Sequence, residues 1–242
     1  MANFVLIHGA WHGAWCWDEL IPALEALGHK AVAIDLPGGG SDTTPAKDVT
    51  LDACARRVAE AVKRFDGPVW LAGHSMGGAS ITAGAELVHE RLVGLIYITA
   101  GLPTNGQPLL AAMQGGGEPD KVQQNIVIDE ATGSGSVPAE HVVEAFYHLC
   151  SPEQVERARK LLREWQVLAP GVEPITITAD GGGAVPRYYV ECLNDQAITI
   201  AAQRRMHQAA GVKAVATLDA DHSPFWSRTA ELAQAMDGFT RA

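Results

Sequence analysis

The sequence predicts an α/β fold with a mostly parallel central sheet, helices on both faces and an inserted helical cap. Two observations carry this prediction. Short apolar runs alternate with helical patterns along the first part of the chain, and the same alternation returns near its end. The pattern is typical of strand–helix–strand units, because parallel strands must be joined by crossover connections. The length of 242 residues fits one large domain, and 47% hydrophobic residues provide enough material for its core.

The first part of the predicted sheet consists of short apolar strands, each followed by a helix. The run Phe4-Val5-Leu6-Ile7 opens the chain as a strand, and the pattern from Leu51 places apolar residues at helical spacing. The loop Asp35-Leu36-Pro37-Gly38-Gly39-Gly40 cannot continue the strand before it. In chain order the predicted elements are a strand at 4–7, a helix at 17–26, a strand at 31–34, a helix at 51–65, a strand at 69–72, a helix at 76–89 and a strand at 92–99.

A different composition marks residues 103–186, which are rich in Gly, Pro and polar residues. Strand patterns are weak there, and helical patterns occur at 140–150 and 152–168, so we predict an insertion that lies over the sheet as a cap. The sheet then resumes with a strand at 187–192, a helix at 200–210, a strand at 214–218 and a final helix from 229. One domain over residues 1–242, with this insertion, is the economical description.

The charge balance argues against nucleic acid as a partner. The net charge is −10, and Lys and Arg form no basic stripe of the kind that binds phosphates. The N-terminus enters an apolar run without a basic region, so we expect no signal peptide. Because no apolar run approaches the roughly 20 residues of a membrane span, we expect a soluble, cytoplasmic protein without a membrane partner. The sequence does not determine the oligomeric state, and a homodimer is compatible with it.

The cysteines predict neither disulfides nor a metal site. The four residues are widely scattered and form no C-x-x-C pair. We expect them to be reduced and mostly buried. They are Cys16, Cys54, Cys150 and Cys192.

The segment Gly73-His74-Ser75-Met76-Gly77 carries the clearest chemical signal. It matches G-x-S-x-G directly after a predicted strand and at the start of a predicted helix, which is the nucleophile elbow of the α/β-hydrolase fold. The flanking glycines leave room where a Cβ would collide with the neighbouring elements. The turn exposes the serine at a helix N-terminus, where the helix dipole favours developing negative charge. Ser75 is therefore the predicted nucleophile.

A serine hydroxyl needs a base, and position must select it among nine histidines. In this fold the chain order is serine, acid, histidine. His222 lies in a polar loop between the last strand and the last helix, at the same sheet edge as Ser75. We predict His222 as the general base. Three other histidines lie near the site but precede or adjoin the nucleophile, namely His8, His12 and His74.

An acid must hold the histidine in the right tautomer. Asp195 follows the strand at 187–192, again at the C-terminal edge, and is the predicted acid. Asp219 and Asp221 are too close to His222 along the chain to reach behind its ring easily, and Asp180 follows no clear strand.

The oxyanion hole is expected from backbone amides. In this fold one N–H comes from the segment after the first strand and the other from the residue after the serine. These positions are Ala10, in His8-Gly9-Ala10-Trp11, and Met76. The mechanism needs no cofactor and no metal.

Four segments resemble the α/β-hydrolase branch that contains plant methyl-ester esterases, plant hydroxynitrile lyases and related bacterial esterases. They are FVLIHGAWHGAWCW, GHSMGG, CLNDQAI and DADHSPFWS, whereas residues 103–186 carry little resemblance. The resemblance implies a triad of Ser75, Asp195 and His222. The lyases have a Thr directly after the first-strand His and a Lys directly after the catalytic His. This sequence has Gly9 and Ser223 there, which disfavours cyanohydrin cleavage.

The expected function is hydrolysis of a small carboxylic ester, apolar or aromatic, through an acyl-enzyme. Aromatic residues near the predicted site favour such a substrate. The alternatives are a hydroxynitrile lyase-like or C–C bond hydrolase activity on the same scaffold, or a non-catalytic small-molecule receptor. The candidate substrate-binding residues are Gly9, Trp11, Phe146 and Phe225.

Overall fold

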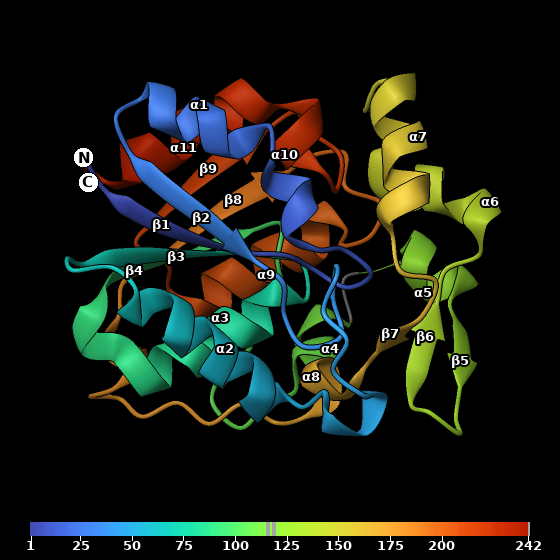
Figure 1. Ribbon diagram of the computed structural model, residues 1–242, viewed down its shortest axis with the longest axis horizontal. Helices are drawn as coiled ribbons and strands as arrows, with labels where there is room; N and C mark the ends of the chain where they lie inside the picture. The colour runs from blue at the N-terminus through green and yellow to red at the C-terminus, as the bar shows by residue number, and fades with distance from the viewer. Residues whose placement is uncertain (115–116, 118–119, 242) are drawn as a thin grey trace.

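The computed structural model describes residues 1–114, 117 and 120–241, and its centre is a six-stranded sheet in which all neighbouring strands are parallel. The strand order is β2-β1-β3-β4-β8-β9, so the chain starts near one edge, crosses the sheet and ends at the other. Figure 1 shows helices on both faces and the two termini side by side. The strands are β1 (Asn3–Ile7), β2 (Lys30–Ile34), β3 (Val69–His74), β4 (Leu92–Ile98), β8 (Arg187–Cys192) and β9 (Ala214–Leu218).

Two hydrophobic cores lie against the two faces of the sheet. The side chains of β4 alternate between them, because successive residues of a strand point to opposite faces: Ile96 and Ile98 enter one core, Leu95 and Tyr97 the other. The first core is covered by α1 (Leu20–Ala26) and α11 (Thr229–Phe239), and the second by α2 (Leu51–Lys63), α3 (Gly77–Val88) and α9 (Ile200–Ala210) (Figure 1).

Most predicted elements of the sheet begin and end within two residues of the observed ones. Helix α2 begins at Leu51 because the Thr50 side chain accepts a hydrogen bond from the Ala53 N–H. The helix predicted at 17–26 is wrong in its first part, which contains the 3-10 turn η1 (Ala14–Trp17) instead. Pro22 explains the difference: proline is tolerated in the first turn of a helix but not in its interior, so α1 begins only at Leu20.

The segment between β4 and β8 lies at the C-terminal edge of the sheet (Figure 1). It contains helices, as predicted, and also a three-stranded antiparallel sheet, which the weak strand patterns of this segment did not predict. Helix α7 ends at Leu161 rather than at 168, because the chain turns extended at Leu162 and then pairs with β6. The elements are α4 (Leu109–Met113), α5 (Lys121–Asn125), β5 (Val127–Asp129), β6 (Ser134–Ser136), α6 (Ala139–Val142), the π-helical turn η4 (Val143–Tyr147), α7 (Pro152–Leu161), β7 (Gln166–Val167), α8 (Ala169–Val172) and η5 (Gly182–Ala184).

The remaining elements are short. They are η2 (Ala46–Asp48), η3 (His89–Arg91) and α10 (Pro224–Ser227). The expected cap limits fall in the loop before α4 and directly before β8. All four cysteines are free, and three of them are buried, as predicted.

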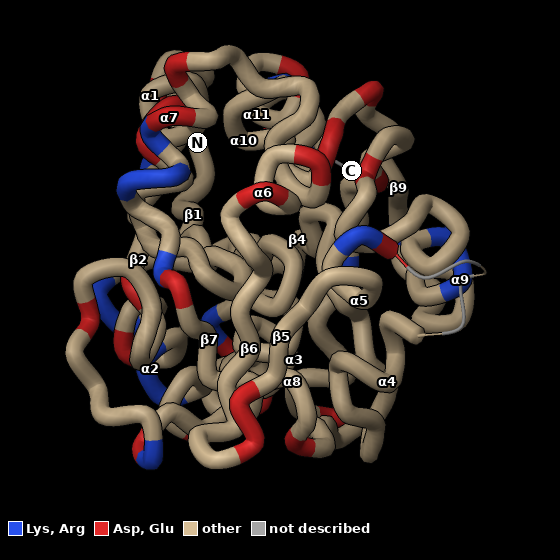
Figure 2. Tube along the Cα trace, turned by 90° about the vertical axis from the view of Figure 1, so that its right-hand side faces the viewer, with Lys and Arg blue, Asp and Glu red and all other residues tan. Residues whose placement is uncertain are grey.

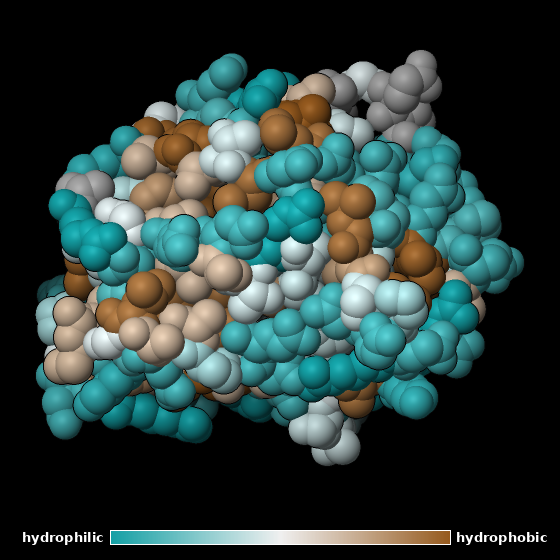
Figure 3. Space-filling view, turned by 90° about the horizontal axis from the view of Figure 1, so that it is seen from above, coloured by the Kyte–Doolittle hydropathy of each residue, from teal (hydrophilic) through white to brown (hydrophobic). Residues whose placement is uncertain are grey.

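The surface mixes charges and apolar groups. Lys and Arg positions are interspersed with Asp and Glu on the face seen in Figure 2, and hydrophobic residues form separate patches among hydrophilic ones in Figure 3. Among the described residues, no helix has both the length and the apolar character that crossing a bilayer requires.

Candidate active site

Ser75 lies in the sharp turn between β3 and α3. Its φ of 53° is in the left-handed region, which a non-glycine residue adopts only at a cost of about 1–3 kcal/mol. The turn leaves no room at Gly77, where a Cβ would lie 2.6 Å from the His8 carbonyl oxygen. Glycine there lets α3 approach the end of β1. The strained turn therefore presents the Ser75 hydroxyl at the N-terminus of α3.

Asp195 and His222 form a buried hydrogen-bonded pair. They follow the neighbouring strands β8 and β9, and His222 Nδ1 lies 2.7 Å from Asp195 Oδ2. Because a carboxylate can only accept, Nδ1 carries the proton, which leaves Nε2 of the neutral ring able to accept one. This is the tautomer that a general base for serine requires.

The carboxylate of Asp195 is fixed by further donors. Its Oδ1 accepts hydrogen bonds from the backbone N–H groups of Ala197 at 2.6 Å and Ile198 at 2.8 Å. Its Oδ2 also accepts one from the Thr99 hydroxyl. Thr99 has a φ of 34° and lies just past the end of β4. Our sequence reasoning missed this residue, although its place after a strand at the C-terminal edge is a usable signal.

The rival carboxylates lie elsewhere. Asp219 is exposed and accepts a hydrogen bond from Asn194 Nδ2 at 2.6 Å, and Asp180 is exposed. Asp221 is buried, but it accepts from the Leu149 N–H at 2.8 Å and from the Ser227 hydroxyl at 2.7 Å. Asp221 thus connects the cap to the loop that carries His222. Of the four aspartates, Asp195 alone forms a hydrogen bond with the His222 ring.

A small cavity of about 70 Å³, here called the inner cavity, brings Ser75 and His222 together. Within the described part of the chain, no hydrogen bond joins the Ser75 hydroxyl to the His222 ring. Catalytic hydrogen bonds are often long before substrate binds. Apart from Ser75 and His222 the lining is apolar: Ala10, Trp11, Met76, Leu110, Met113, Val122, Ile126, Phe146, Leu168 and Ala197.

The predicted oxyanion residues both line the inner cavity. Ala10 follows β1 and Met76 follows Ser75. Neither backbone N–H donates a hydrogen bond to another described group. Two such amides beside a serine hydroxyl are suited to hold an oxyanion.

The four predicted substrate-binding residues divide into two pairs. Trp11 and Phe146 line the inner cavity, whereas Gly9 and Phe225 do not appear among its described lining residues. A Cβ at Gly9 would lie 2.7 Å from Ser75 Cβ, so Gly9 packs directly against the elbow. Phe225 is fully buried, and its ring centroid lies 5.1 Å from that of His74. Both residues therefore pack against the residues that form the site, and neither faces the inner cavity in the described lining.

Three buried histidines surround the site, and each has a fixed tautomer. His8 Nδ1 donates to the Gly9 carbonyl at 2.8 Å and its Nε2 accepts from the Leu36 N–H at 3.0 Å. His12 Nδ1 donates to the Ala10 carbonyl at 2.7 Å, and its Nε2 accepts from the Tyr147 hydroxyl at 2.6 Å.

The third of these histidines supports the candidate base directly. His74 Nε2 donates to the backbone carbonyl of His222 at 2.7 Å, and the two ring centroids lie 4.6 Å apart. Burial lowers the pKa of His8, lowers that of His74 well below its ordinary value, and lowers that of His12 to about 3. All three are therefore neutral near pH 7, so none of them places a positive charge beside His222.

These neutral histidines predict a loss of stability in mild acid. Below pH 6.5 the unfolded chain binds protons at His8, His12 and His74 that the folded protein excludes, so the free energy of unfolding falls as the pH falls. For His12 the loss continues toward pH 3. A histidine that stays neutral in the folded protein contributes a slope that rises toward about 1.4 kcal/mol per pH unit as the unfolded chain becomes protonated. Urea unfolding at pH 7, 6 and 5 measures the slope.

Replacing His12 by glutamine should reduce this slope. A free energy of unfolding that is independent of pH over this range would contradict the assignment of neutral buried histidines.

Residues 4–235 match the family described as the alpha/beta hydrolase family. A pyrethroid hydrolase from Sphingobium wenxiniae is 32% identical over 255 aligned residues, which cover 100% of this chain and 89% of that protein. Methylesterase 9 of Arabidopsis thaliana is 29% identical, with 96% of this chain and 95% of the relative covered.

Solved structures give the same result. The crystal structure of a pyrethroid hydrolase from Sphingobium faniae has a TM-score of 0.88 and 30% identity, covering 100% of this chain and 98% of that one. The crystal structure of polyneuridine aldehyde esterase has a TM-score of 0.87, and at 24% identity, over 99% of each chain, it supports the fold alone. The fold class predicted from the sequence is confirmed, and the chain belongs to the alpha/beta hydrolase family.

Proposed function

We propose that this protein is a serine carboxylesterase that cleaves carboxylic esters through an acyl-enzyme. The observation that carries the proposal is the inner cavity, in which Ser75 on its strained turn and His222, hydrogen-bonded to Asp195, line the same space. The names of the relatives support ester hydrolysis, since they include methylesterases and a pyrethroid hydrolase.

In the proposed mechanism His222 Nε2 accepts the proton of the Ser75 hydroxyl while Oγ attacks the ester carbonyl carbon. The carbonyl oxygen becomes an oxyanion held by the N–H groups of Ala10 and Met76. The intermediate collapses, the bond to the alcohol oxygen breaks, and His222 returns its proton to that oxygen. Water then gives a proton to His222 and attacks the acyl carbon, which releases the acid and restores Ser75.

The inner cavity supports a substrate group that is apolar and small. The described residues of its walls include no Asp, Glu, Lys or Arg, so the group bound there gains burial without needing a counter-charge. Loss of one oxyanion donor typically costs about 2.7–4 kcal/mol of transition-state stabilisation, so the amides of Ala10 and Met76 account for a large part of the expected rate enhancement.

Cyanohydrin cleavage fits the site less well. The position that carries Thr in the lyases is Gly9, and a Cβ there would lie 2.7 Å from Ser75 Cβ and 2.9 Å from His74 Nδ1. Ser223, at the position of the lyase Lys, is uncharged and fully buried. These two positions therefore supply neither the hydroxyl that binds the cyanohydrin oxygen in the lyases nor the ammonium that stabilises the departing cyanide.

The proposal is tested with two substrates and one covalent probe. The purified protein should release nitrophenolate from p-nitrophenyl acetate and release no cyanide from mandelonitrile. A fluorophosphonate should add to the Ser75 oxygen with loss of fluoride, giving a labelled peptide in mass spectrometry. Rapid cyanide release without ester turnover, or labelling at another residue, would overturn the proposal.

A further inference from the structure

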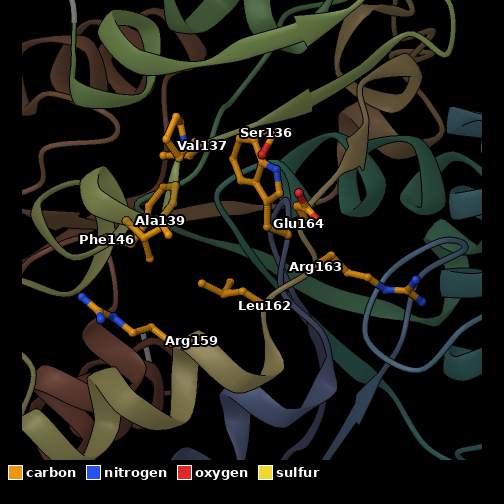
Figure 4. A pocket seen from close by; sticks show the side chains of 11 residues that line it. Ser136, Val137, Ala139, Phe146, Arg159, Leu162, Arg163 and Glu164 are labelled. Atoms are coloured by element: carbon orange, nitrogen blue, oxygen red, sulfur yellow. The ribbon is translucent and has the colours of Figure 1, made fainter.

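A second, larger cavity of about 360 Å³ lies within the cap, beside the inner cavity, and is here called the outer cavity. Its walls come from the end of β6 and the segment after it, from α6 and η4, from α7 and the residues that follow it, and from Trp11. Figure 4 shows Val137, Ala139, Phe146 and Leu162 on different sides of the same space. Most of the surface around it is therefore apolar.

The outer cavity and the inner cavity share two aromatic walls. Trp11 and Phe146 line both, and their ring centroids lie 5.7 Å apart with the planes tilted by 36°. The Phe146 ring also lies 5.6 Å from the His222 ring. The two rings thus form a partition directly beside the candidate base, with catalytic groups on one side and the larger space on the other.

The volumes decide which groups each cavity accepts. An engineered apolar cavity of about 150 Å³ binds one benzene molecule. The inner cavity, at about 70 Å³, is smaller than that, whereas the outer cavity, at about 360 Å³, is larger. The outer cavity therefore accommodates an aromatic group more readily than the inner cavity does.

Trp11 is the fixed part of the partition. Its N–H donates to Gln166 Oε1 at 3.0 Å, its indole Nε1 donates to the Gly135 carbonyl at 2.9 Å, and its carbonyl accepts from the Arg163 N–H at 2.9 Å. These bonds hold the residue in a left-handed conformation, with a φ of 62°.

Phe146 is the part of the partition whose side chain no hydrogen bond holds in place. Its ring has no polar atom that could form a hydrogen bond. The residue belongs to the π-helical turn η4, and such turns are rare in proteins overall but often occur at functional sites. Because Phe146 lies between the two cavities, an ester that occupies both requires this ring to move aside.

The charged residues that line the outer cavity have partners or are exposed to solvent, so they do not indicate a charged ligand. Arg163 donates from Nε to the Gly40 carbonyl at 3.0 Å and also to the Asp42 carbonyl, and Figure 4 shows its side chain extending away from the cavity. Arg159 lies at the rim, within 3.8 Å of Glu156, and is half-exposed to solvent. Glu164 also lines the outer cavity and is exposed to solvent. The rest of the lining therefore suits a neutral, apolar group.

We propose that the outer cavity is a second substrate compartment, which binds the large apolar group of an asymmetric ester while its small group occupies the inner cavity. This inference rests on the proposed esterase function and narrows it to esters that join a group no larger than a few heavy atoms to an aromatic or comparably bulky group. The scissile bond of such an ester lies at the partition, within reach of Ser75 and His222.

The test fills the outer cavity from its exposed edge. Ala139 is exposed and lines the outer cavity, so Ala139→Trp adds an indole there with little risk to folding. Ala201, an exposed residue of α9 that lines neither cavity, gives the matched control Ala201→Trp. The readout is the ratio of kcat/KM for naphthyl acetate to kcat/KM for methyl acetate.

We expect Ala139→Trp to lower this ratio by about tenfold or more, which is about 1.4 kcal/mol, and Ala201→Trp to leave it unchanged. A ratio within about twofold of the wild-type value, or an equal fall for both esters, overturns the second compartment while ester hydrolysis itself stands.

Binding tests the compartment independently of turnover. The dissociation constant of naphthyl acetate is measured by calorimetry with Ser75→Ala and with the same protein carrying Ala139→Trp. The compartment predicts binding about tenfold weaker in the double variant, and equal binding overturns it. If the wild-type protein hydrolyses neither ester, the proposed function fails, and this comparison still decides whether the outer cavity binds the group.

Discussion

Replacing Ser75 by alanine should lower kcat for p-nitrophenyl acetate by about 10⁴-fold or more. The loss is large because nucleophile, base and acid act as one unit, so removing the hydroxyl leaves only the oxyanion donors and substrate binding. The structure makes Ser75 the sole hydroxyl among the described residues that line the inner cavity. Nitrophenolate release at saturating substrate measures the effect.

The matched control is Ser80, which lies in α3 and is buried away from the inner cavity. Ser80→Ala removes a serine hydroxyl from the helix that directly follows the Ser75 turn and should keep kcat within a few-fold of wild type. A Ser75→Ala protein that folds normally by circular dichroism yet retains near-normal turnover would show that another group is the nucleophile.

The second large effect is expected from Asp195→Asn, which should lower kcat by about 10⁴-fold. The substituted side chain offers an amide that can donate to His222 Nδ1, and this favours the tautomer with the proton on Nε2. Such a ring cannot accept the Ser75 proton. Geometry is otherwise retained, since Oδ1 still accepts from the Ala197 and Ile198 N–H groups.

Asp221→Asn provides the comparison, because Asp221 is also buried and adjoins His222 in the chain. It contacts Leu149 and Ser227 instead of the ring. We expect Asp221→Asn to weaken the attachment of the cap. Its kcat should remain about a hundredfold or more above that of Asp195→Asn. The reverse order of the two losses would make Asp221 the acid.

Much of the fold could be predicted because its signals are local. β3 is buried along its whole length and therefore reads as a continuous apolar run, and α2 has a Thr50 cap and an apolar stripe. The sheet order brings the ends of β1, β3, β8 and β9 to one edge. Residues that follow these strands therefore had to lie near one another, and the candidate triad was drawn from them.

The cap could not be predicted to the same degree. Strand β7 has two residues and strands β5 and β6 have three, which is too short for a period-two pattern. Their pairing depends on contacts between distant segments, such as Ser134 with Val167. No local pattern distinguishes Gln166, which accepts from the Trp11 N–H, from an ordinary surface glutamine.

The sequence by itself determined the chain order of serine, acid and histidine and the sheet edge at which they lie, because a G-x-S-x-G turn and parallel strands leave few alternatives. Only the tertiary structure shows the hydrogen bond between His222 and Asp195, the acid predicted from the sequence, and only it decided that Trp11 and Phe146 separate two cavities of unequal size. Which side chains touch depends on packing between segments far apart in the chain. That information is absent from any local pattern.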